Sequence, residues 1–249
     1  QCTFVNTHYF IDPIIILRNC NELFVKHCFF KNISRYMMLV EHSNFINFNN
    51  MTLTNVGVTG SNQAKKKPLF FLQKCKLFIL ASSYFSNINY PGLKISDITL
   101  TKILNTTFVN CVCPLRITFH LRKLNFTIIF LRSNFSSCLC KSSGGSFGIT
   151  WLNSTDDNNK PNIFKSNVYF YGTIYLLLNI QHTMFRGCHS NLNGGALGSM
   201  FSNFGNYKGV NSSMFITNCS FYNNTSEKQG GTIFILYSNL IFVEHCSFI

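Results

Sequence analysis

The residues best suited to acid–base chemistry are the eight carboxylates of this 249-residue chain, and they are widely spread. Polysaccharide hydrolysis usually needs two carboxylates about 5–10 Å apart. The only adjacent acidic pair, Asp156-Asp157, closely follows Trp151, the single tryptophan. A tryptophan beside an acidic loop could stack on a sugar ring, which makes these three residues a candidate ligand site. A core ring followed by a solvated turn is the simpler interpretation, so no catalytic residue is assigned.

Histidine and cysteine could supply metal or proton-transfer chemistry, and both recur at fixed places. Four histidines stand three residues before a phenylalanine that recurs along the chain. They are His27, His42, His182 and His245. That position otherwise carries Asn, Ser, Arg or Gln, which favours a solvated face over a metal or proton-transfer row. Cys111-Val112-Cys113 and Cys138-Leu139-Cys140 suggest zinc ligands, but zinc pairs more often have two or more intervening residues. The sequence therefore predicts no metal and no cofactor.

Seven of the eleven cysteines form two columns when the recurring segments are aligned. Cys2, Cys28, Cys219 and Cys246 share one position, and Cys111, Cys138 and Cys188 share another. Neighbours in a column would be one repeat apart, a spacing compatible with a disulfide. Free thiols that fill a layer of the core are equally compatible, because cysteine behaves as a small hydrophobic residue. The core ladder is the favoured interpretation.

The net charge of +13 suggests an anionic partner such as nucleic acid, acidic glycan or membrane lipid. Most basic residues are scattered, and the one cluster is Lys65-Lys66-Lys67, before Pro68 in a predicted loop. These lysines are a second candidate ligand site. Because no segment shows the pattern of a groove-reading helix and no aromatic-basic RNA-binding motif occurs, no nucleic acid is expected as a partner. A biased composition that is poor in acidic residues is the favoured explanation of the charge.

A short pattern that recurs about every 25 residues must position all of these groups. It reads small-x-Phe, often with Asn two residues later. The central residues are Phe4, Phe30, Phe45, Phe85, Phe108, Phe135, Phe185, Phe221 and Phe248. Five residues earlier the chain is always apolar, at Val25, Val40, Leu80, Ile103, Phe130, Ile180, Ile216 and Val243. Apolar and polar positions alternate with the period of strands, and no long helical period competes.

A unit of about 25 residues with short strands cannot bury its own apolar face, whereas stacked copies can. Parallel pairing of successive units would place each Phe over the next and each Asn over another, at a repeated corner. The sequence therefore predicts an all-β fold, a right-handed parallel β-helix with coils of about 25 residues. Residues 1–249 form one such domain, expected to be a fragment of a longer solenoid.

Irregular spacings between the central phenylalanines predict insertions. Loops are expected near residues 55–68, 153–162 and 199–213. The step from Phe135 to Phe185 spans two average repeats, which predicts one coil with a degenerate motif between them. No apolar run reaches the length that crosses a membrane, and the best one, Tyr169 to Ile180, is expected to form a strand.

Paired glycines support this interpretation and carry a family resemblance. Three segments share the pattern: Gly144-Gly145-Ser146-Phe147, Gly194-Gly195-Ala196-Leu197 and Gly230-Gly231-Thr232-Ile233. Together with Phe221-Tyr222-Asn223-Asn224, they resemble the tandem motifs of chlamydial polymorphic outer-membrane proteins and of related protist surface proteins. These families belong to the pectin-lyase-like β-helix superfamily. The Phe motif covers most of the chain and the Gly-Gly motif its second half.

The resemblance implies an extracellular or cell-surface protein that adheres to glycans or to a host or neighbouring cell surface. The expected function is a non-enzymatic scaffold or adhesin that presents polar columns and loops. A truncated polysaccharide lyase or glycoside hydrolase of the same fold remains the alternative, since such enzymes share the superfamily. A third alternative is a basic module that holds an anionic polymer.

Sequons for N-glycosylation are more frequent than the composition alone would give, which supports a secreted glycoprotein. They lie at Asn32, Asn50, Asn105, Asn125, Asn134, Asn153, Asn211, Asn218, Asn223 and Asn224. Adjacent sequons such as Asn223 and Asn224 cannot all be used together.

Overall fold

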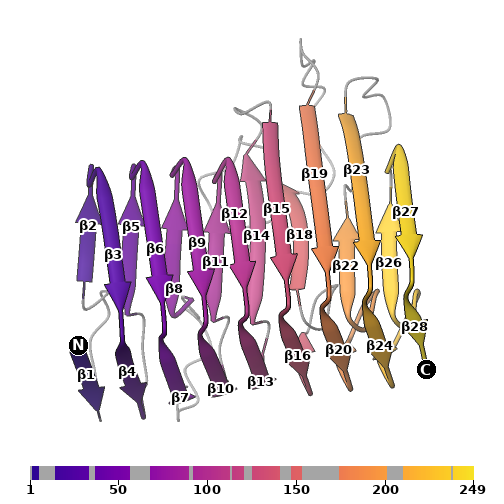
Figure 1. Cartoon of the computed structure of the whole chain (residues 1–249), viewed down its shortest axis with the longest axis horizontal. Coiled ribbons are helices and arrows are strands. Elements are labelled where there is room, and N and C mark those ends of the chain that lie inside the picture. Colours follow the sequence, from indigo (N-terminus) through magenta and orange to yellow (C-terminus); the bar gives the residue numbers. More distant parts are fainter. Residues whose placement is uncertain are drawn as a thin grey trace.

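The computed structural model describes residues 2–5, 15–33, 37–56, 68–89, 92–112, 114–120, 125–140, 147–152, 174–200, 210–236 and 238–249. Within these ranges the secondary structure is all β, and every strand pair is parallel. The strands stack along one axis, with the two ends of the chain at opposite ends of the stack (Figure 1). The prediction of a parallel β-solenoid is therefore confirmed.

Three long sheets form the walls of the solenoid within the described residues. Sheet A contains β1 (Cys2–Val5), β4 (Cys28–Lys31), β7 (Thr52–Val56), β10 (Tyr84–Ile88), β13 (Thr107–Cys111), β16 (Asn134–Ser136), β20 (Met184–Arg186), β24 (Ser220–Tyr222) and β28 (Ser247–Phe248). Sheet B contains β2 (Ile15–Arg18), β5 (Met38–Glu41), β8 (Phe70–Gln73), β11 (Leu93–Ser96), β14 (Leu115–His120), β18 (Phe147–Leu152), β22 (Leu197–Met200) and β26 (Ile233–Leu236).

Sheet C and a small sheet D complete the walls. Sheet C contains β3 (Glu22–Lys26), β6 (Phe45–Asn49), β9 (Leu77–Ala81), β12 (Leu100–Leu104), β15 (Asn125–Leu131), β19 (Ile174–Gln181), β23 (Val210–Thr217) and β27 (Leu240–Glu244). Sheet D contains β17 (Leu139–Cys140), β21 (His189–Ser190) and β25 (Thr225–Ser226). The chain passes from sheet B to sheet C to sheet A, and each strand pairs with the strand one coil later.

The corner between sheets C and A is a ladder of residues with positive φ. These residues are His27, Asn50, Ser82, Asn105, Arg132, His182, Asn218 and His245, with φ between 47° and 53°. A left-handed residue turns the chain abruptly between two strands, and asparagine tolerates this conformation better than most residues. The histidine column of the sequence is therefore part of a backbone corner rather than a set of converging ligands.

A second ladder of positive φ follows the central residue of sheet A, where the sequence places its recurrent asparagine. It contains Asn32, Asn55, Asn87, Asn110, Ser137, Gly187 and Asn223. The amide Nδ2 of Asn87 donates to Oδ1 of Asn55 at 2.9 Å, and that of Asn110 donates to Oδ1 of Asn87 at 3.2 Å. The predicted corner of stacked side-chain amides is confirmed.

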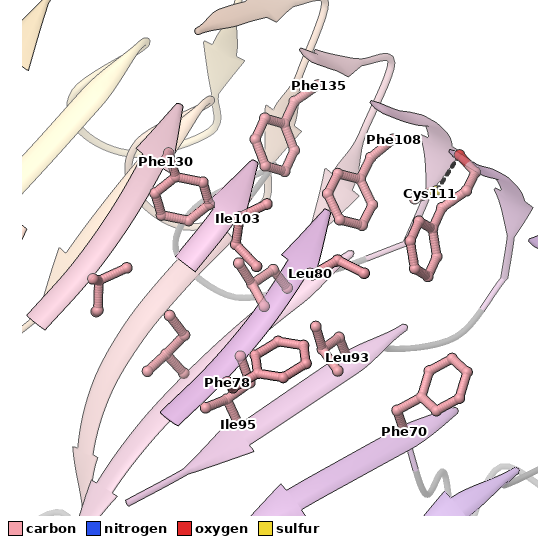
Figure 2. Close-up of a cluster of buried hydrophobic side chains, with 14 of the residues drawn as sticks. Phe70, Phe78, Leu80, Leu93, Ile95, Ile103, Phe108, Cys111, Phe130 and Phe135 are labelled. Atoms are coloured by element: carbon pink, nitrogen blue, oxygen red, sulfur yellow. Dashed lines mark hydrogen bonds between the residues drawn. The ribbon is translucent and has the colours of Figure 1, made fainter. Parts of the chain in front are cut away.

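From Phe85 onward, the interior contains a continuous column of stacked rings from sheet A, packed against apolar side chains of sheets B and C. Phe108 and Phe135 stack with centroids 4.9 Å apart, and Phe135 and Phe185 with centroids 5.2 Å apart. Figure 2 shows Phe108 and Phe135 beside Leu80 and Ile103, all pointing into the same core. In-register parallel pairing produces this column, because each ring lies over the equivalent ring of the adjacent coil.

One copy of the predicted repeat is misaligned. Phe45 begins β6 in sheet C, and the position in the ring column belongs to Leu53, which pairs with both Phe30 and Phe85. The error arises because the left-handed residue His42 precedes Phe45 at the corner between sheets B and C. That corner uses the same local pattern, a left-handed residue and then small-x-Phe, as the corner between sheets C and A. The same correction applies to the apolar column five residues before the central phenylalanine, where Phe48 and not Val40 lies between Val25 and Leu80.

The predicted degenerate coil between Phe135 and Phe185 does not exist. Phe135 pairs directly with Phe185 in adjacent strands, so one coil carries an insertion. The predicted loop 153–162 lies outside the described residues. Most of the predicted loops 55–68 and 199–213 also lies outside the described residues. Of their described parts, residues 55–56 belong to β7, residues 199–200 to β22 and residues 210–213 to β23.

The solenoid divides into a first region, β2 to β13, and a second region, from β14 onward. In the first region, the corner between sheets B and C is a single left-handed residue, at Asn19, His42, Lys74 and Asp97. In the second region, sheet C strands lengthen from five residues to seven in β15 and eight in β19 and β23. Sheet D also belongs to the second region alone within the described residues.

Candidate functional site

The two candidate ligand sites of the sequence fall largely outside the described residues. Asp156, Asp157 and Lys65-Lys66-Lys67 lie there, as does the sequon residue Asn153. Trp151 lies on β18, where its backbone pairs with that of Phe119 in β14. The structure therefore does not test whether Trp151 and the acidic pair form one site.

An open groove of about 420 Å³ lies on the outer face of sheet C in the second region. It is lined by Asn125, Phe126, Thr127, Tyr175, Leu176, Leu177, Ser213 and Phe215. These residues come from β15, β19 and β23, the three strands that extend beyond their counterparts in the first region (Figure 1). The groove is a product of that extension.

Because the strands pair in register, the residues that line the groove form rows that run across β15, β19 and β23. Asn125 pairs with Tyr175, and Thr127 pairs with Leu177, which in turn pairs with Ser213. Tyr175 is 51% exposed and Leu177 is 38% exposed, so both present apolar surface to solvent. An exposed cluster of this kind is a common sign of an interaction site.

The groove offers contacts suited to binding. Tyr175 and Phe215 supply aromatic surface, and Phe215 packs against Phe242 with ring centroids 6.1 Å apart. Asn125, Thr127 and Ser213 supply amide and hydroxyl groups that donate and accept hydrogen bonds. Among the eight residues that line the groove, no carboxylate, imidazole or thiol occurs. A few polar groups within an apolar lining are the usual composition of a small-ligand site.

The structure places the predicted glycosylation residues in three distinct environments. Asn32, Asn50, Asn105, Asn218 and Asn223 occupy left-handed corners. At three of these corners, the sequon residue precedes a buried residue and then an outward-facing strand residue, at Met51-Thr52, Thr106-Thr107 and Cys219-Ser220. The sequence pattern of these corners therefore produces Asn-x-Ser/Thr sequons by itself. This accounts for part of the excess of sequons without glycosylation.

Four other sequons lie in strands or beside them. Asn224 uses its side chain structurally, because its Oδ1 accepts from the backbone of Cys188 at 2.9 Å and its Nδ2 donates to the carbonyl of Phe185 at 3.0 Å. Asn134 lies in β16, and its buried Oδ1 has no hydrogen-bond partner. Asn211 belongs to β23. Asn125 lines the groove, so a glycan attached there would occupy the same space as a ligand.

A polar cluster on sheet D was not predicted. Nδ1 of His189 lies 2.9 Å from Oγ1 of Thr225, and Nε2 of His189 lies 3.7 Å from Oε1 of Glu227. Nδ2 of Asn191 donates to the same carboxylate at 3.0 Å. Because His189 and Glu227 are both well exposed, these contacts have the character of cross-strand surface pairs. The only sequence signal was that His189 and Thr225 both lie four residues after a central phenylalanine.

The cysteine columns form a ladder of thiols inside the solenoid. Cys111, Cys138 and Cys188 are free, buried and stacked on successive coils. Hydrogen bonds from the Cys138 thiol to the sulfur atoms of Cys111 and Cys188, together with burial, raise the pKa of Cys138 well above its ordinary value. Burial raises the pKa of Cys219 to about 11. The favoured core ladder is thus confirmed for these residues, whereas Cys140 takes part in a disulfide.

No protein-family model, no curated protein and no solved structure matches the chain. Among the described residues, no group of three His, Cys, Asp or Glu side chains converges to hold a metal ion. A membrane-spanning helix is likewise not found in the part of the chain that the structure describes. What the chain does must therefore be inferred from the solenoid and its outer faces.

Proposed function

We propose that the chain is a secreted or cell-surface adhesin whose rigid solenoid presents the sheet C groove to glycans of a host or neighbouring cell surface. It acts by binding rather than by catalysis. The observation that carries this proposal is the groove itself, where aromatic, amide and hydroxyl groups converge on three lengthened strands. Sugar rings present apolar C–H faces and a rim of hydroxyls, which such a lining complements.

We further propose that the fold is a right-handed parallel β-helix of the pectin-lyase-like superfamily, with coils of about 25 residues. Parallel strands joined by a crossover are right-handed in almost all known cases, because of the intrinsic twist of strands. Residues paired on successive coils, such as Asn87 and Asn110, are 23 apart along the sequence. The Gly-Gly segments support the resemblance to the repeats of chlamydial and protist surface proteins.

The extracellular location is supported by the sequons and by the disulfide of Cys140, since disulfides persist in oxidising compartments. Three of the free thiols, Cys111, Cys138 and Cys188, are enclosed in the core. Their burial protects them from oxidants and partners in solution. A free-thiol assay on secreted protein, with and without denaturant, tests this location.

The functional experiment is a panel of neutral and acidic polysaccharides incubated with the purified chain, in which retention and polymer length are both followed. Retention of intact polymer by the wild type, lost in Tyr175→Ala/Phe215→Ala, is the expected result. The matched control is Tyr84→Ala/Tyr222→Ala, which removes exposed aromatic residues from sheet A. Shortening of any polymer would replace adhesion with a carbohydrate-active enzyme of the same fold. Unchanged retention in the groove variant would overturn the assignment of the groove.

A further inference from the structure

The outer face of sheet B carries two cations that face each other, and no described carboxylate pairs with either of them. Lys94 on β11 and Arg116 on β14 are register partners on adjacent strands. Lys94 is half-buried, and its ammonium lies 4.7 Å from the ring centroid of Phe71 on the next strand. Like charges placed directly opposite each other in a sheet are destabilising. The arrangement therefore costs stability unless an anion joins it.

The same face of the same sheet shows how a basic residue is normally satisfied. Arg18 on β2 has Glu41 as its register partner on β5, and its Nε donates to Oε2 of that carboxylate at 2.7 Å. Glu41 also accepts a hydrogen bond from Gln73, one coil further along. At the position of Lys94, the equivalent partner on the adjacent strand is a second cation rather than a carboxylate.

Among the described residues, the neighbouring positions on this face provide no carboxylate that is free to pair with Lys94 or Arg116. In the next row, Glu41 is already engaged by Arg18 and Gln73, and its register neighbours Gln73 and Ser96 are neutral. Beyond Arg116 the row continues to Gly148 and Gly198, which have no side chain. The nearby carboxylate of Asp97 is buried at the corner, where it accepts a hydrogen bond from Ser96 at 3.4 Å.

The electrostatics of both groups agree with an unfilled anion site. Burial, followed by the charge of Arg116, lowers the pKa of Lys94. Burial also lowers the pKa of Arg116. A bound oxyanion would reverse both effects, because an opposite charge favours the protonated forms.

We propose that Lys94, Arg116 and the ring of Phe71 form a binding site for a carboxylate or sulfate group of an acidic polysaccharide. The site is built from side chains on the outer face of sheet B, where the half-buried Lys94 meets the exposed Arg116, so a free small ion would keep part of its hydration and be held weakly. A polymer with repeated anionic groups gains effective concentration along the solenoid surface, and the net charge of +13 attracts it. This inference is independent of the sheet C groove.

The test measures binding of an end-labelled sulfated oligosaccharide to the full chain by fluorescence anisotropy. Lys94→Gln/Arg116→Gln is expected to bind at least about tenfold more weakly, with a salt dependence of log Kd shallower by about two units. The matched control is Lys31→Gln/Arg132→Gln, which removes the same charge from exposed positions on other walls. Equal affinities of the wild type and the site variant, or an equal loss in the control, would overturn the proposal.

Competitors distinguish the sources of the anion. A non-sulfated uronate oligosaccharide should displace the probe, whereas a neutral oligosaccharide should not, and inorganic sulfate or phosphate should do so only at far higher concentration. Single-stranded DNA of matched charge that binds as tightly as the oligosaccharide would contradict the polysaccharide assignment. Displacement by inorganic phosphate at the concentration of the oligosaccharide would contradict it too.

A second variant keeps the proposal testable if the double variant folds poorly. Arg116→Glu recreates across Lys94 the kind of ion pair that Arg18 makes with Glu41, so it should remain folded and lose the probe. Without ligand, its thermal unfolding should occur at or above the wild-type temperature, because a repulsion becomes an attraction. A folded Arg116→Glu variant that keeps full affinity would overturn the site.

Discussion

The first and second regions of the solenoid share one core and differ in the walls around it. In the first region, a single left-handed residue such as His42 or Asp97 joins sheets B and C. In the described part of the second region, three strands of sheet C are longer and sheet D is present. The ring column continues through both regions, from Phe85 to Phe221.

This difference shows which parts of a solenoid can change in length while the core stays intact. Each coil contacts only its neighbours, so an insertion at a corner leaves the stacking of the walls intact. The groove and the His189 cluster both belong to the second region, where the repeat is least regular. The groove that we propose for neutral glycans therefore lies in the second region, whereas the proposed anion site joins a strand of the first region, β11, to one of the second, β14.

The largest loss of stability is expected from mutations in the ring column, and it tests whether the two regions share one core. Phe85→Ala in the first region and Phe135→Ala in the second each remove a fully buried stacked ring. Both should lower the free energy of unfolding by about 4 kcal/mol, from lost burial and a residual cavity. Urea denaturation measures this, with the exposed Tyr84→Ala as control. A large loss at only one site would show that the cores of the two regions are separate.

A glycine substitution should damage the second region selectively. A Cβ on Gly195 would lie 2.1 Å from the carbonyl oxygen of Gly231 and 2.4 Å from that of Thr225. Gly195→Ala should therefore cost about 3 kcal/mol by overpacking and separate the strands of sheet D. Gly231→Ala is the matched control, because its nearest new contact is 3.9 Å.

Hydrogen exchange of peptides covering sheet D, compared with peptides covering β6 and β9, reports this damage directly. We expect faster exchange near Gly195 and unchanged exchange in the first region. If Gly195→Ala and Gly231→Ala behave alike, the packing described for sheet D is wrong.

The pH dependence of the free energy of unfolding should differ between the two regions at one position of the repeat, the small residue two positions before the central phenylalanine. Cys219 occupies in the second region the place of the hydroxyl residues Ser83 and Thr106 in the first. Burial raises the pKa of Cys219 from 9.0 to about 11. The folded state therefore keeps the thiol protonated while the unfolded chain ionises.

This thiol should make stability fall as the pH rises from about 9 to about 11, by about 2 kcal/mol. Below pH 9 the thiol should have no effect, because it is protonated in both states. Cys219→Ala should reduce that slope, whereas Ser83→Ala should leave it unchanged. Parallel pH profiles for wild type and Cys219→Ala in denaturant titrations would contradict the burial of this thiol.

The smallest expected effect is common to both regions. Asn105 in the first and Arg132 in the second occupy equivalent left-handed corners, with φ of 47° and 52°. Replacement of either by valine should cost about 1–2 kcal/mol, because a β-branched side chain is strained there. Thermal unfolding of Asn105→Val and Arg132→Val, with glycine variants as controls, measures this cost. A glycine variant less stable than the valine variant would exclude the left-handed corner.

The walls and the ring column were predictable because they depend on residue types that recur at a fixed spacing. The alignment failed at Phe45, since two corners of each coil use the same local pattern and the sequence does not say which corner is which. It failed again between Phe135 and Phe185, where an insertion has the length of a coil. Only pairing in space separates these possibilities.

The groove and the two unpredicted polar sites could not be read from the repeat. Tyr175 and Phe215 are far apart in sequence and share no motif, and they meet because β19 and β23 lengthen together. Lys94 and Arg116 likewise become neighbours only through strand register. The candidate residues chosen from the sequence came from predicted loops, whereas these contacts form on the outer faces of the sheets.

We propose that neutral glycans bind at the sheet C groove of the second region, and hydrogen–deuterium exchange in the presence of a retained neutral polysaccharide tests this proposal most directly. We expect slower exchange in peptides covering β15, β19 and β23, around Tyr175 and Phe215, and no change in β3, β6 and β9. Protection confined to the first region, or spread equally over sheet C, would contradict it.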